Sequence, residues 1–362
     1  MSQFQVDADI ASASTLPSAF YTDAAIFDAA KEKIFARTWQ WATTLDHVRV
    51  PGQVFPFNLL EGCLDEPLLI TRDMDDQVRC LSNVCTHRGN LVCDGAGVEK
   101  SLRCRYHGRR FGLDGNCSFM PEFEGVEGFP GVADNLPQIP VGLWRQFYFV
   151  NLALQITLED QFTDVENRVG WMPIQDFAFA PSRARDYLVK AHWALYIDNY
   201  LEGFHIPYVH PALNDALDYG SYTTELLQHG NLQLGVAGEG EPSFDLPTSS
   251  PDHGRRIGAY YFWLFPNLML NFYPWGLSVN VVRPLGPALT KVSFLPFVWD
   301  ESKLDQGAGA ALDRVEREDE AIVEAVQKGL RSRFYDRGRY SIKRECGVHQ
   351  FHRMVAQAME QA

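Results

Sequence analysis

Two short segments of the sequence each place one cysteine close to one histidine. Cys85 is followed by His87 after one intervening residue, and sixteen residues later Cys104 is followed by His107 after two. Thiolate and imidazole ligands in this combination hold either Zn²⁺ or a [2Fe–2S] cluster in which two histidines bind one of the irons. A zinc site more often gathers two cysteines on one loop. The spacing therefore favours a cluster of the Rieske type over zinc and over a chance grouping of core residues.

A second pair of histidines lies in the segment DNYLEGFHIPYVHP, where His205 and His210 are five positions apart near the end of a predicted helix. Two histidines and one carboxylate can bind Fe(II) and leave coordination positions open for O₂ beside a substrate. Asp319 is the candidate carboxylate, because it shares one stripe of a predicted amphipathic helix with Val315 and Ile322. A carboxylate among core-facing residues needs a metal or a cationic partner, so a buried salt bridge is the alternative interpretation.

Other acidic residues near these candidate ligands have weaker positional signals. Glu202 lies three positions before His205, about one helical turn, so its carboxylate can orient the imidazole. A solvated glutamate on the helix surface is the alternative. Glu316, Glu318 and Glu320 flank Asp319 on other faces of their helix, where exposure to solvent is expected.

Aromatic residues are concentrated at 260–265 and 272–275, within predicted strands. Such residues can form a box that binds a quaternary ammonium group by cation–π attraction, although packing in a hydrophobic core is the simpler interpretation. An aromatic pocket without an acidic group would suit a ring substrate. An aromatic pocket with a carboxylate would suit a cation.

The elements that must position these residues change in type along the chain. Residues 18–40 have helical periodicity and predict one helix. Residues 48–152 contain short alternating apolar runs broken by Gly, Asp and Pro, which predict antiparallel strands. Later segments mix types, with helices predicted around 191–205 and 310–330 and strands over 260–282. The fold class predicted for the chain is α+β.

The chain has 362 residues, which is enough for two domains besides a terminal segment. We expect an N-terminal helical segment over 1–40 that packs on the later domain. A small antiparallel β domain is expected over 41–153 and a mixed domain over 154–362.

Composition restricts the partners and the compartment. The net charge of −14 is the wrong sign for binding nucleic acid or an anionic membrane surface, and no apolar run approaches the roughly 20 residues that span a bilayer. The first sixteen residues lack the features of a targeting signal. Seven scattered cysteines suit a reducing compartment, so a cytoplasmic location is expected.

With both motifs in order, the chain resembles the catalytic α subunits of Rieske-type non-haem iron oxygenases, the aromatic-ring-hydroxylating dioxygenase family. The resemblance rests on CTHRGN…CRYHGRRFGLDG, DNYLEGFHIPYVHP and EREDEAIVEAVQKGLRSRFYDRGRY. The late segments look most like choline monooxygenase and related quaternary-ammonium enzymes. The resemblance implies a small antiparallel-β Rieske domain and a helix-grip α+β catalytic domain. It also implies the two ligand sets: Cys85, His87, Cys104 and His107 for the [2Fe–2S] cluster, and His205, His210 and Asp319 for a mononuclear Fe(II).

The same resemblance implies an assembly. Glu202 matches the acidic residue, commonly Asp, that connects the iron site of one subunit to the Rieske histidine of the next, so a homotrimer is expected, with His107 of a neighbouring copy as electron donor. The family often has Trp after its YHG motif, where this chain has Arg109. We expect this difference to alter the surface that meets the reductase.

The resemblance implies an oxygenase that takes electrons from NAD(P)H through a separate reductase, with or without a ferredoxin. The chain itself has no GxGxxG fingerprint for a flavin or nicotinamide. The expected reaction is hydroxylation or N-demethylation of a small betaine-, choline- or carnitine-like compound. Alternatives are hydroxylation or dihydroxylation of an aromatic acid or related ring and, in another class, a non-catalytic Rieske electron carrier or ligand-binding protein.

Overall fold

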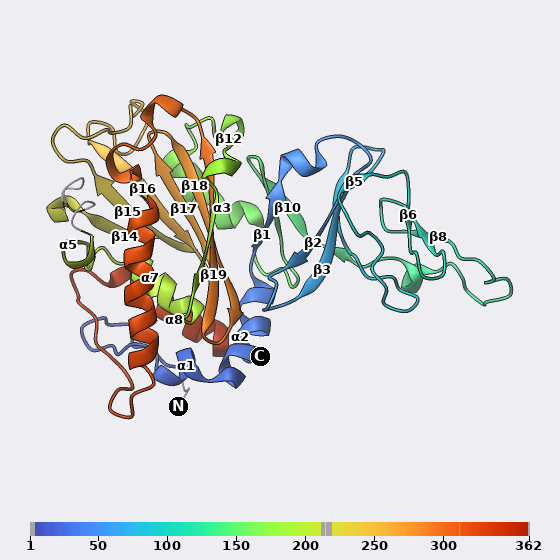
Figure 1. Ribbon diagram of the computed structural model, residues 1–362, viewed down its shortest axis with the longest axis horizontal. Helices are drawn as coiled ribbons and strands as arrows, with labels where there is room; N and C mark the ends of the chain where they lie inside the picture. The colour runs from blue at the N-terminus through green and yellow to red at the C-terminus, as the bar shows by residue number, and fades with distance from the viewer. Residues whose placement is uncertain (1–3, 211–213, 215–218, 311, 361–362) are drawn as a thin grey trace. The chain divides into compact units, whose positions relative to one another are not determined.

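The structure is a computed structural model that describes residues 4–210, 214, 219–310 and 312–360. The chain divides into two compact units. The smaller unit is Ala36–Leu158, and the larger unit combines Met1–Phe35 with Glu159–Ala362. Both helices and antiparallel strands are present (Figure 1), so the predicted α+β class is confirmed.

The smaller unit consists of three antiparallel sheets with strand orders β1-β11-β10, β5-β2-β3-β4-β9 and β6-β7-β8. Its core contains the fully buried Leu69, Leu81 and Phe111, and Cys85 and Cys104 belong to the same buried cluster. The loops that carry the two cysteines therefore start from the core. The strands are β1 (Gln40–Thr44), β2 (Gln53–Leu59), β3 (Glu66–Arg72), β4 (Val78–Ser82), β5 (Gly97–Val98), β6 (Leu102–Arg103), β7 (Arg110–Phe111), β8 (Cys117–Phe119), β9 (Gln138–Ile139), β10 (Val141–Trp144) and β11 (Phe147–Val150).

The larger unit is built around one antiparallel sheet of eight strands, ordered β12-β19-β18-β17-β16-β15-β14, with β13 also paired to β19. Its strands contain long apolar and aromatic runs because both faces of the sheet are largely buried. The strands are β12 (Ala178–Phe179), β13 (Arg185–Val189), β14 (Thr223–Leu226), β15 (Gly230–Val236), β16 (Ile257–Leu264), β17 (Leu268–Tyr273), β18 (Gly276–Gly286) and β19 (Leu289–Val298).

Helices of the larger unit lie against this sheet. Helix α4 contacts α7, α8 and β18, and α7 also contacts β13, so that α7 crosses the front of the sheet in Figure 1. These contacts bring the end of α4, where the DNYLEG segment begins, next to the acidic helix α7. The helices are α1 (Ser18–Thr22), α2 (Ala24–Lys33), α3 (Leu158–Val169), α4 (Trp193–Tyr200), α5 (Ile206–Val209), α7 (Leu312–Gly329) and α8 (Cys346–Glu360).

The single helix predicted over 18–40 is wrong. Asp23 separates α1 from α2 and caps α2, since its carboxylate accepts hydrogen bonds from the backbone N–H groups of Ala25 and Ile26. Helix α2 ends at Lys33, and β1 begins at Gln40. The apolar periodicity of 34–40 therefore belongs to a 3-10 turn and to the start of a strand.

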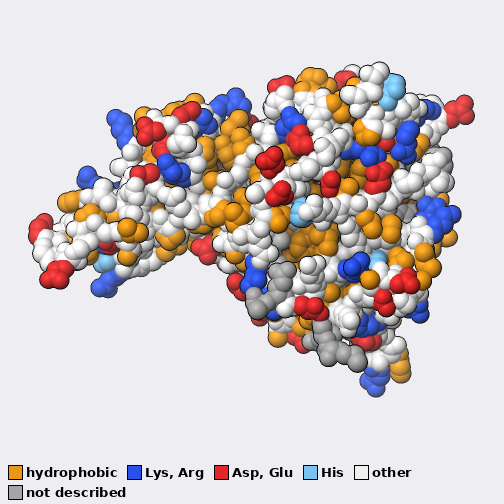
Figure 2. All heavy atoms as spheres, turned by 180° about the vertical axis from the view of Figure 1, so that it is seen from behind, with side chains coloured by type: hydrophobic (Ala, Val, Ile, Leu, Met, Phe, Trp, Pro, Cys, Tyr) orange, Lys and Arg blue, Asp and Glu red, His pale blue; other side chains and the backbone are white. Residues whose placement is uncertain are grey.

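Two further observations concern the surface. Among the described helices, none combines the length and the apolar character that crossing a bilayer requires. On the face shown in Figure 2, lysine and arginine side chains are scattered among acidic and polar ones.

Candidate metal centres

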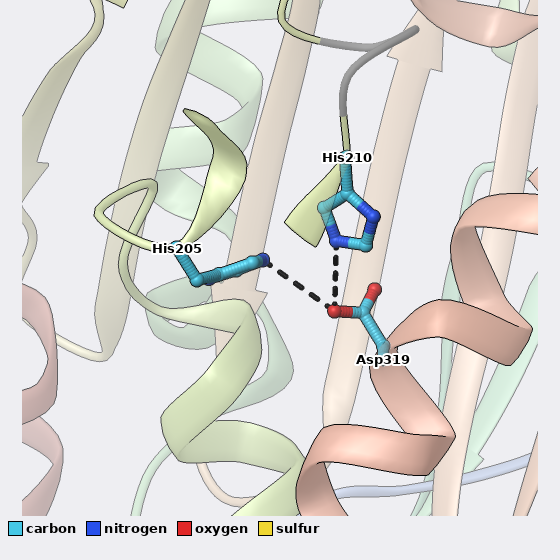
Figure 3. Close-up of side chains that lie close together, drawn as sticks. All are labelled: His205, His210 and Asp319. Carbon is cyan, nitrogen blue, oxygen red and sulfur yellow. Dashed lines mark hydrogen bonds and ion pairs between the residues drawn. The ribbon is translucent and has the colours of Figure 1, made fainter. Parts of the chain in front are cut away.

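Three side chains of the larger unit converge at one point beside α7. His205 and His210 lie at the two ends of the short helix α5, whose early Pro207 is compatible with a first helical turn. Asp319 lies on α7 and points at both imidazoles (Figure 3). One donor atom from each of the three residues lies within 4.8 Å of the other two.

The donor atoms of this group fit a divalent iron. Nε2 of His210 lies 2.9 Å from Oδ1 of Asp319, and Nε2 of His205 lies 3.4 Å from the same oxygen. Two imidazole nitrogens and one carboxylate are the donors of the 2-His-1-carboxylate triad, which binds Fe(II) and leaves positions open. Asp319 also accepts a hydrogen bond of 2.6 Å from the side-chain amide of Asn199, which fixes the carboxylate.

Each of the two imidazoles is held by a second carboxylate. Nδ1 of His205 lies 2.8 Å from Oε1 of Glu202, and Nδ1 of His210 lies 2.8 Å from Oε2 of Glu318. The hydrogen bond with His210 lowers the pKa of Glu318, so this carboxylate is ionised and accepts a hydrogen bond from the Nδ1–H group. A protonated Nδ1 leaves Nε2 of each ring available to a metal. Glu202 also accepts hydrogen bonds from the backbone N–H groups of Phe204 and His205.

The solvent-facing orientation predicted for the flanking glutamates is wrong for Glu316, which is 3% exposed, whereas Glu318 is 27% exposed and also contacts His210. The apolar stripe was assigned to the wrong phase of α7, because Ile322 and Val326 are 40% and 44% exposed whereas Glu316 and Gln327 are only 3% exposed. Hydropathy alone misplaces this face, since its buried positions include polar side chains. Asp319 lies at the edge of the true buried face, which is why it still meets the histidines.

A cavity of about 110 Å³ adjoins the three converging side chains. Its walls include five tyrosines and several side-chain amides. On β16 and β17 the cavity residues are Tyr261, Asn271 and Tyr273, while Tyr260 and Phe272 are fully buried in the opposite, core-facing direction. Only part of the predicted aromatic set thus lines a pocket. The tyrosines are Tyr196, Tyr200, Tyr222, Tyr261 and Tyr273.

Glu316 adds a buried carboxyl group to this cavity. The hydroxyl of Tyr196 donates to its Oε2 at 2.6 Å, whereas its Oε1 has no hydrogen-bond partner among the described residues. Burial raises the pKa of Glu316 to about 8. Burial also raises the pKa values of Tyr200, Tyr222 and Tyr273, so these phenols stay neutral. The burial of this glutamate could not be predicted from the sequence, because apolar periodicity identifies only apolar residues on a buried helix face.

In the smaller unit, the two Cys-His segments form loops with the same backbone pattern. The N–H of Cys85 donates to the carbonyl of Asn90 and that of Gly89 donates back to Cys85. The second loop repeats this arrangement, with Cys104 bonded to the carbonyl of Arg109 and to the N–H of Gly108. Both glycines have positive φ values, +71° and +79°, which favour glycine at these turns.

The two loops bring their four candidate ligands together. The thiol groups of Cys85 and Cys104 are buried and contact each other, and the rings of His87 and His107 lie with centroids 4.8 Å apart. His107 is exposed at the loop tip. Two buried thiols with two outer imidazoles match the donor set of a Rieske cluster, in which the histidines replace two cysteines on one iron.

The expectation for Arg109 is wrong, because its side chain is only 3% exposed and presents no surface to a reductase. The guanidinium donates to Thr86 Oγ1 at 2.9 Å and lies 3.2 Å from Oδ1 of Asp134. It also packs over the rings of Phe123 and Phe129 at 5.5 and 5.3 Å. Arg109 therefore ties the first cluster loop to the 123–134 segment.

Replacing Arg109 with methionine should destabilise the smaller unit. The change leaves Asp134 without its cation and removes contacts to two aromatic rings, for an expected loss of about 3 kcal/mol. Thermal unfolding followed through the visible absorbance of the cluster measures this loss. Arg110→Met is the matched control, because Arg110 is exposed and should change stability by less than about 0.5 kcal/mol. Equal losses in the two variants would contradict the structural role of Arg109.

Comparison with protein families identifies both units. Residues 38–130 match the Rieske [2Fe-2S] domain, and residues 177–361 match the ring hydroxylating alpha subunit (catalytic domain). The chain is 29% identical to the chloroplastic choline monooxygenase of Spinacia oleracea, over 96% of this chain and 79% of that protein. It is 30% identical to the carnitine monooxygenase oxygenase subunit of Escherichia coli K12, over 96% of this chain and 94% of that protein.

Solved structures agree with these matches. The quaternary ammonium Rieske monooxygenase CntA in complex with L-carnitine superposes with a TM-score of 0.74 at 26% identity, over 96% of each chain. Naphthalene 1,2-dioxygenase with bound indole shares the fold, with a TM-score of 0.72 at 18% identity over 96% of this chain and 92% of that one. The chain belongs to the ring-hydroxylating alpha-subunit family and is the terminal oxygenase component of a Rieske non-haem iron oxygenase system.

Proposed function

We propose that this oxygenase hydroxylates or N-demethylates a small quaternary ammonium compound. The observation that carries the proposal is the cavity beside the three converging side chains, which combines five tyrosines with the buried carboxyl of Glu316. Tyrosine faces attract a quaternary cation, and a carboxylate balances its charge. An uncharged aromatic ring would gain nothing from the carboxyl group. Relatives named for choline and carnitine support the same class of substrate.

The ligand sets follow from the donor atoms. We assign Cys85 and Cys104 to one iron of the [2Fe–2S] cluster and His87 and His107 to the other, within a Rieske domain over about 41–153. We assign His205, His210 and Asp319 to the mononuclear Fe(II) of a catalytic domain over about 154–362. Of the N-terminal segment predicted over 1–40, only the part up to Phe35 belongs to the same compact unit. When bound, this iron supplies O₂ activation next to the substrate. Glu202 and Glu318 keep the two imidazoles in the tautomer that presents Nε2.

Electrons are proposed to arrive from another subunit of a homotrimer. His107 is exposed at its loop tip and can therefore meet another protein, and inter-subunit electron transfer is described for CntA. Glu202 contacts His205 and is the proposed link between the two centres. A separate reductase, with or without a ferredoxin, would deliver two electrons from NAD(P)H. None of the seven cysteines, all of them among the described residues, forms a disulfide, which supports a reducing, cytoplasmic location.

A single turnover of the chemically reduced enzyme with O₂ tests the substrate class. The mixture offered contains glycine betaine, choline, L-carnitine and simple aromatic acids, and products are identified by mass. We expect one of the quaternary compounds to gain an oxygen atom or lose a methyl group, with the second oxygen atom of O₂ released as water. An oxygenated aromatic acid would instead assign the cavity to a ring, and no product with either class would overturn the proposal.

A further inference from the structure

The cavity beside the proposed iron site has carboxyl groups but no lysine or arginine among its described lining residues. Its acidic members are Glu202, Glu316 and Asp319. Glu202 contacts His205, and Asp319 contacts both histidines and Asn199, so both carboxylates already have donors. Glu316 is the acidic member that has no cationic partner among the described residues.

The surroundings of Glu316 contain no cation among the described residues that face it. On its own helix the charged groups that act on it most strongly are Asp313, Asp319 and Glu320, all acidic. Arg314 and Arg317 of the same helix pair instead with Glu318 and Asp313. From α4 and β13 it is faced by Tyr196 and Tyr187, which are neutral phenols. Both histidines in the cavity wall already contact Asp319 through Nε2. Their Nδ1 atoms contact Glu202 and Glu318.

One oxygen of Glu316 is thus buried and unpaired in a cavity wall. Oε2 accepts from Tyr196 at 2.6 Å, while Oε1 has no hydrogen-bond donor and the side chain is 3% exposed. A buried carboxyl without a donor costs free energy and needs a functional reason. A quaternary ammonium group has no N–H to donate, so it interacts only through charge and through contact with aromatic faces. Such a cation would balance Oε1 without requiring the donor that the site lacks.

We propose that Glu316 is the counter-ion of the substrate's ammonium group, and that its carboxyl proton leaves to solvent as the cation enters the cavity. The exchange conserves charge, because a neutral carboxyl group and a free cation become an ion pair and a released proton. This inference rests on the proposed function. It adds the residue that distinguishes a cation from a neutral molecule of the same shape.

The exchange sets a pH dependence for binding. Burial raises the pKa of Glu316 to about 8, so below that pH the free enzyme must lose a proton before the ion pair can form. The affinity for the cation should therefore rise by about tenfold from pH 7 to pH 9. A neutral ligand of the same shape requires no ionised carboxylate, so its affinity should not change with the ionisation of Glu316 between pH 7 and pH 9.

Binding calorimetry on the holoenzyme without reductant tests the inference. The cations are choline, glycine betaine and L-carnitine. Their neutral counterparts have a carbon atom in place of the ammonium nitrogen: 3,3-dimethylbutan-1-ol for choline and 3,3-dimethylbutanoate for betaine. Glu316→Gln should weaken binding of the preferred cation by roughly tenfold or more at pH 9 and change that of its counterpart by less than about threefold. Titrations in phosphate and Tris at pH 7 should show close to one proton released per cation in the wild type and none in Glu316→Gln.

Glu324→Gln is the matched control, because it removes a charge from the same helix at a residue outside the cavity lining, and glutamine can still accept the hydrogen bond from the backbone N–H of Lys190. It should bind both ligands as the wild type does. Thermal unfolding and cluster absorbance establish that each variant is folded. Suppose that the wild type converts a quaternary compound, but Glu316→Gln either binds this compound with unchanged affinity or loses affinity for the cation and its neutral counterpart equally. The counter-ion role is then overturned, while the proposed function stands. If the wild type neither binds nor converts any of the three cations, the proposed function fails as well.

Discussion

Replacing Asp319 with alanine should abolish turnover and lower the iron content from about three to about two atoms per chain. The substitution removes the only carboxylate that the structure places within reach of both Nε2 atoms, at 2.9 Å from His210 and 3.4 Å from His205 among the described residues. Two imidazoles alone do not retain Fe(II) firmly. The cluster should keep its visible absorbance, because its four candidate ligands lie in a different compact unit.

Iron analysis and the electron paramagnetic resonance signal of the reduced cluster separate the two outcomes. Asp313→Ala is the matched control, since Asp313 is on the same helix but is exposed and bonded to Tyr187. This variant should retain three irons and turnover. If Asp319→Ala also kept full iron content and activity, Asp319 would be removed from the proposed ligand set.

The sequence was most informative where a ligand set lies on a short loop. The Cys-x-His and Cys-x-x-His spacings predicted that the two segments share one ligand set, and the structure shows the same backbone hydrogen bonds in both segments. The pairing of His205 with His210 could be predicted equally well, because their five-residue spacing, with Pro207 between them, leaves the backbone of this segment few conformations. These predictions depended on local geometry, which neighbouring residues largely determine.

Predictions that depended on which face of a helix is buried were less successful. Asp319 was assigned to a stripe with Ile322, yet Ile322 is 40% exposed and the buried face carries Glu316 and Gln327. Polar groups are buried there because other segments supply their partners, as Tyr196 does for Glu316 and the N–H of His192 does for Gln327. A hydropathy pattern within one helix contains no information about such partners.

Arg109 illustrates the same limit in the smaller unit. A charged residue after YHG suggested an exposed position, whereas the structure surrounds it with Thr86, Asp134 and two phenylalanine rings. Asp134 follows Arg109 by 25 positions, so neither residue alone indicates the pairing. The sequence therefore located the candidate ligands but did not reveal most of the residues that hold them in place.

Replacing Glu202 with glutamine should slow oxidation of the reduced cluster by about 10–100-fold in a single turnover, with iron content maintained in excess Fe(II). Glutamine preserves the shape of the side chain but removes the charge that faces Nδ1 of His205 at 2.8 Å. If Glu202 links the iron site to a neighbouring subunit, as proposed, this charge lies on the route between the centres. Stopped-flow absorbance of the cluster, after mixing with O₂ and substrate, measures the rate.

Glu318→Gln is the control that separates a linking role from an orienting role. Glu318 holds His210 through the same contact, also at 2.8 Å, but it is not the residue that matches the inter-subunit position. If the two glutamates only orient imidazoles, both variants should slow oxidation of the reduced cluster to the same extent once iron is bound. Slow oxidation of the cluster in Glu202→Gln alone, with iron present in both variants, would establish that electrons reach the iron site by way of Glu202. An unchanged rate in Glu202→Gln would exclude it from that route.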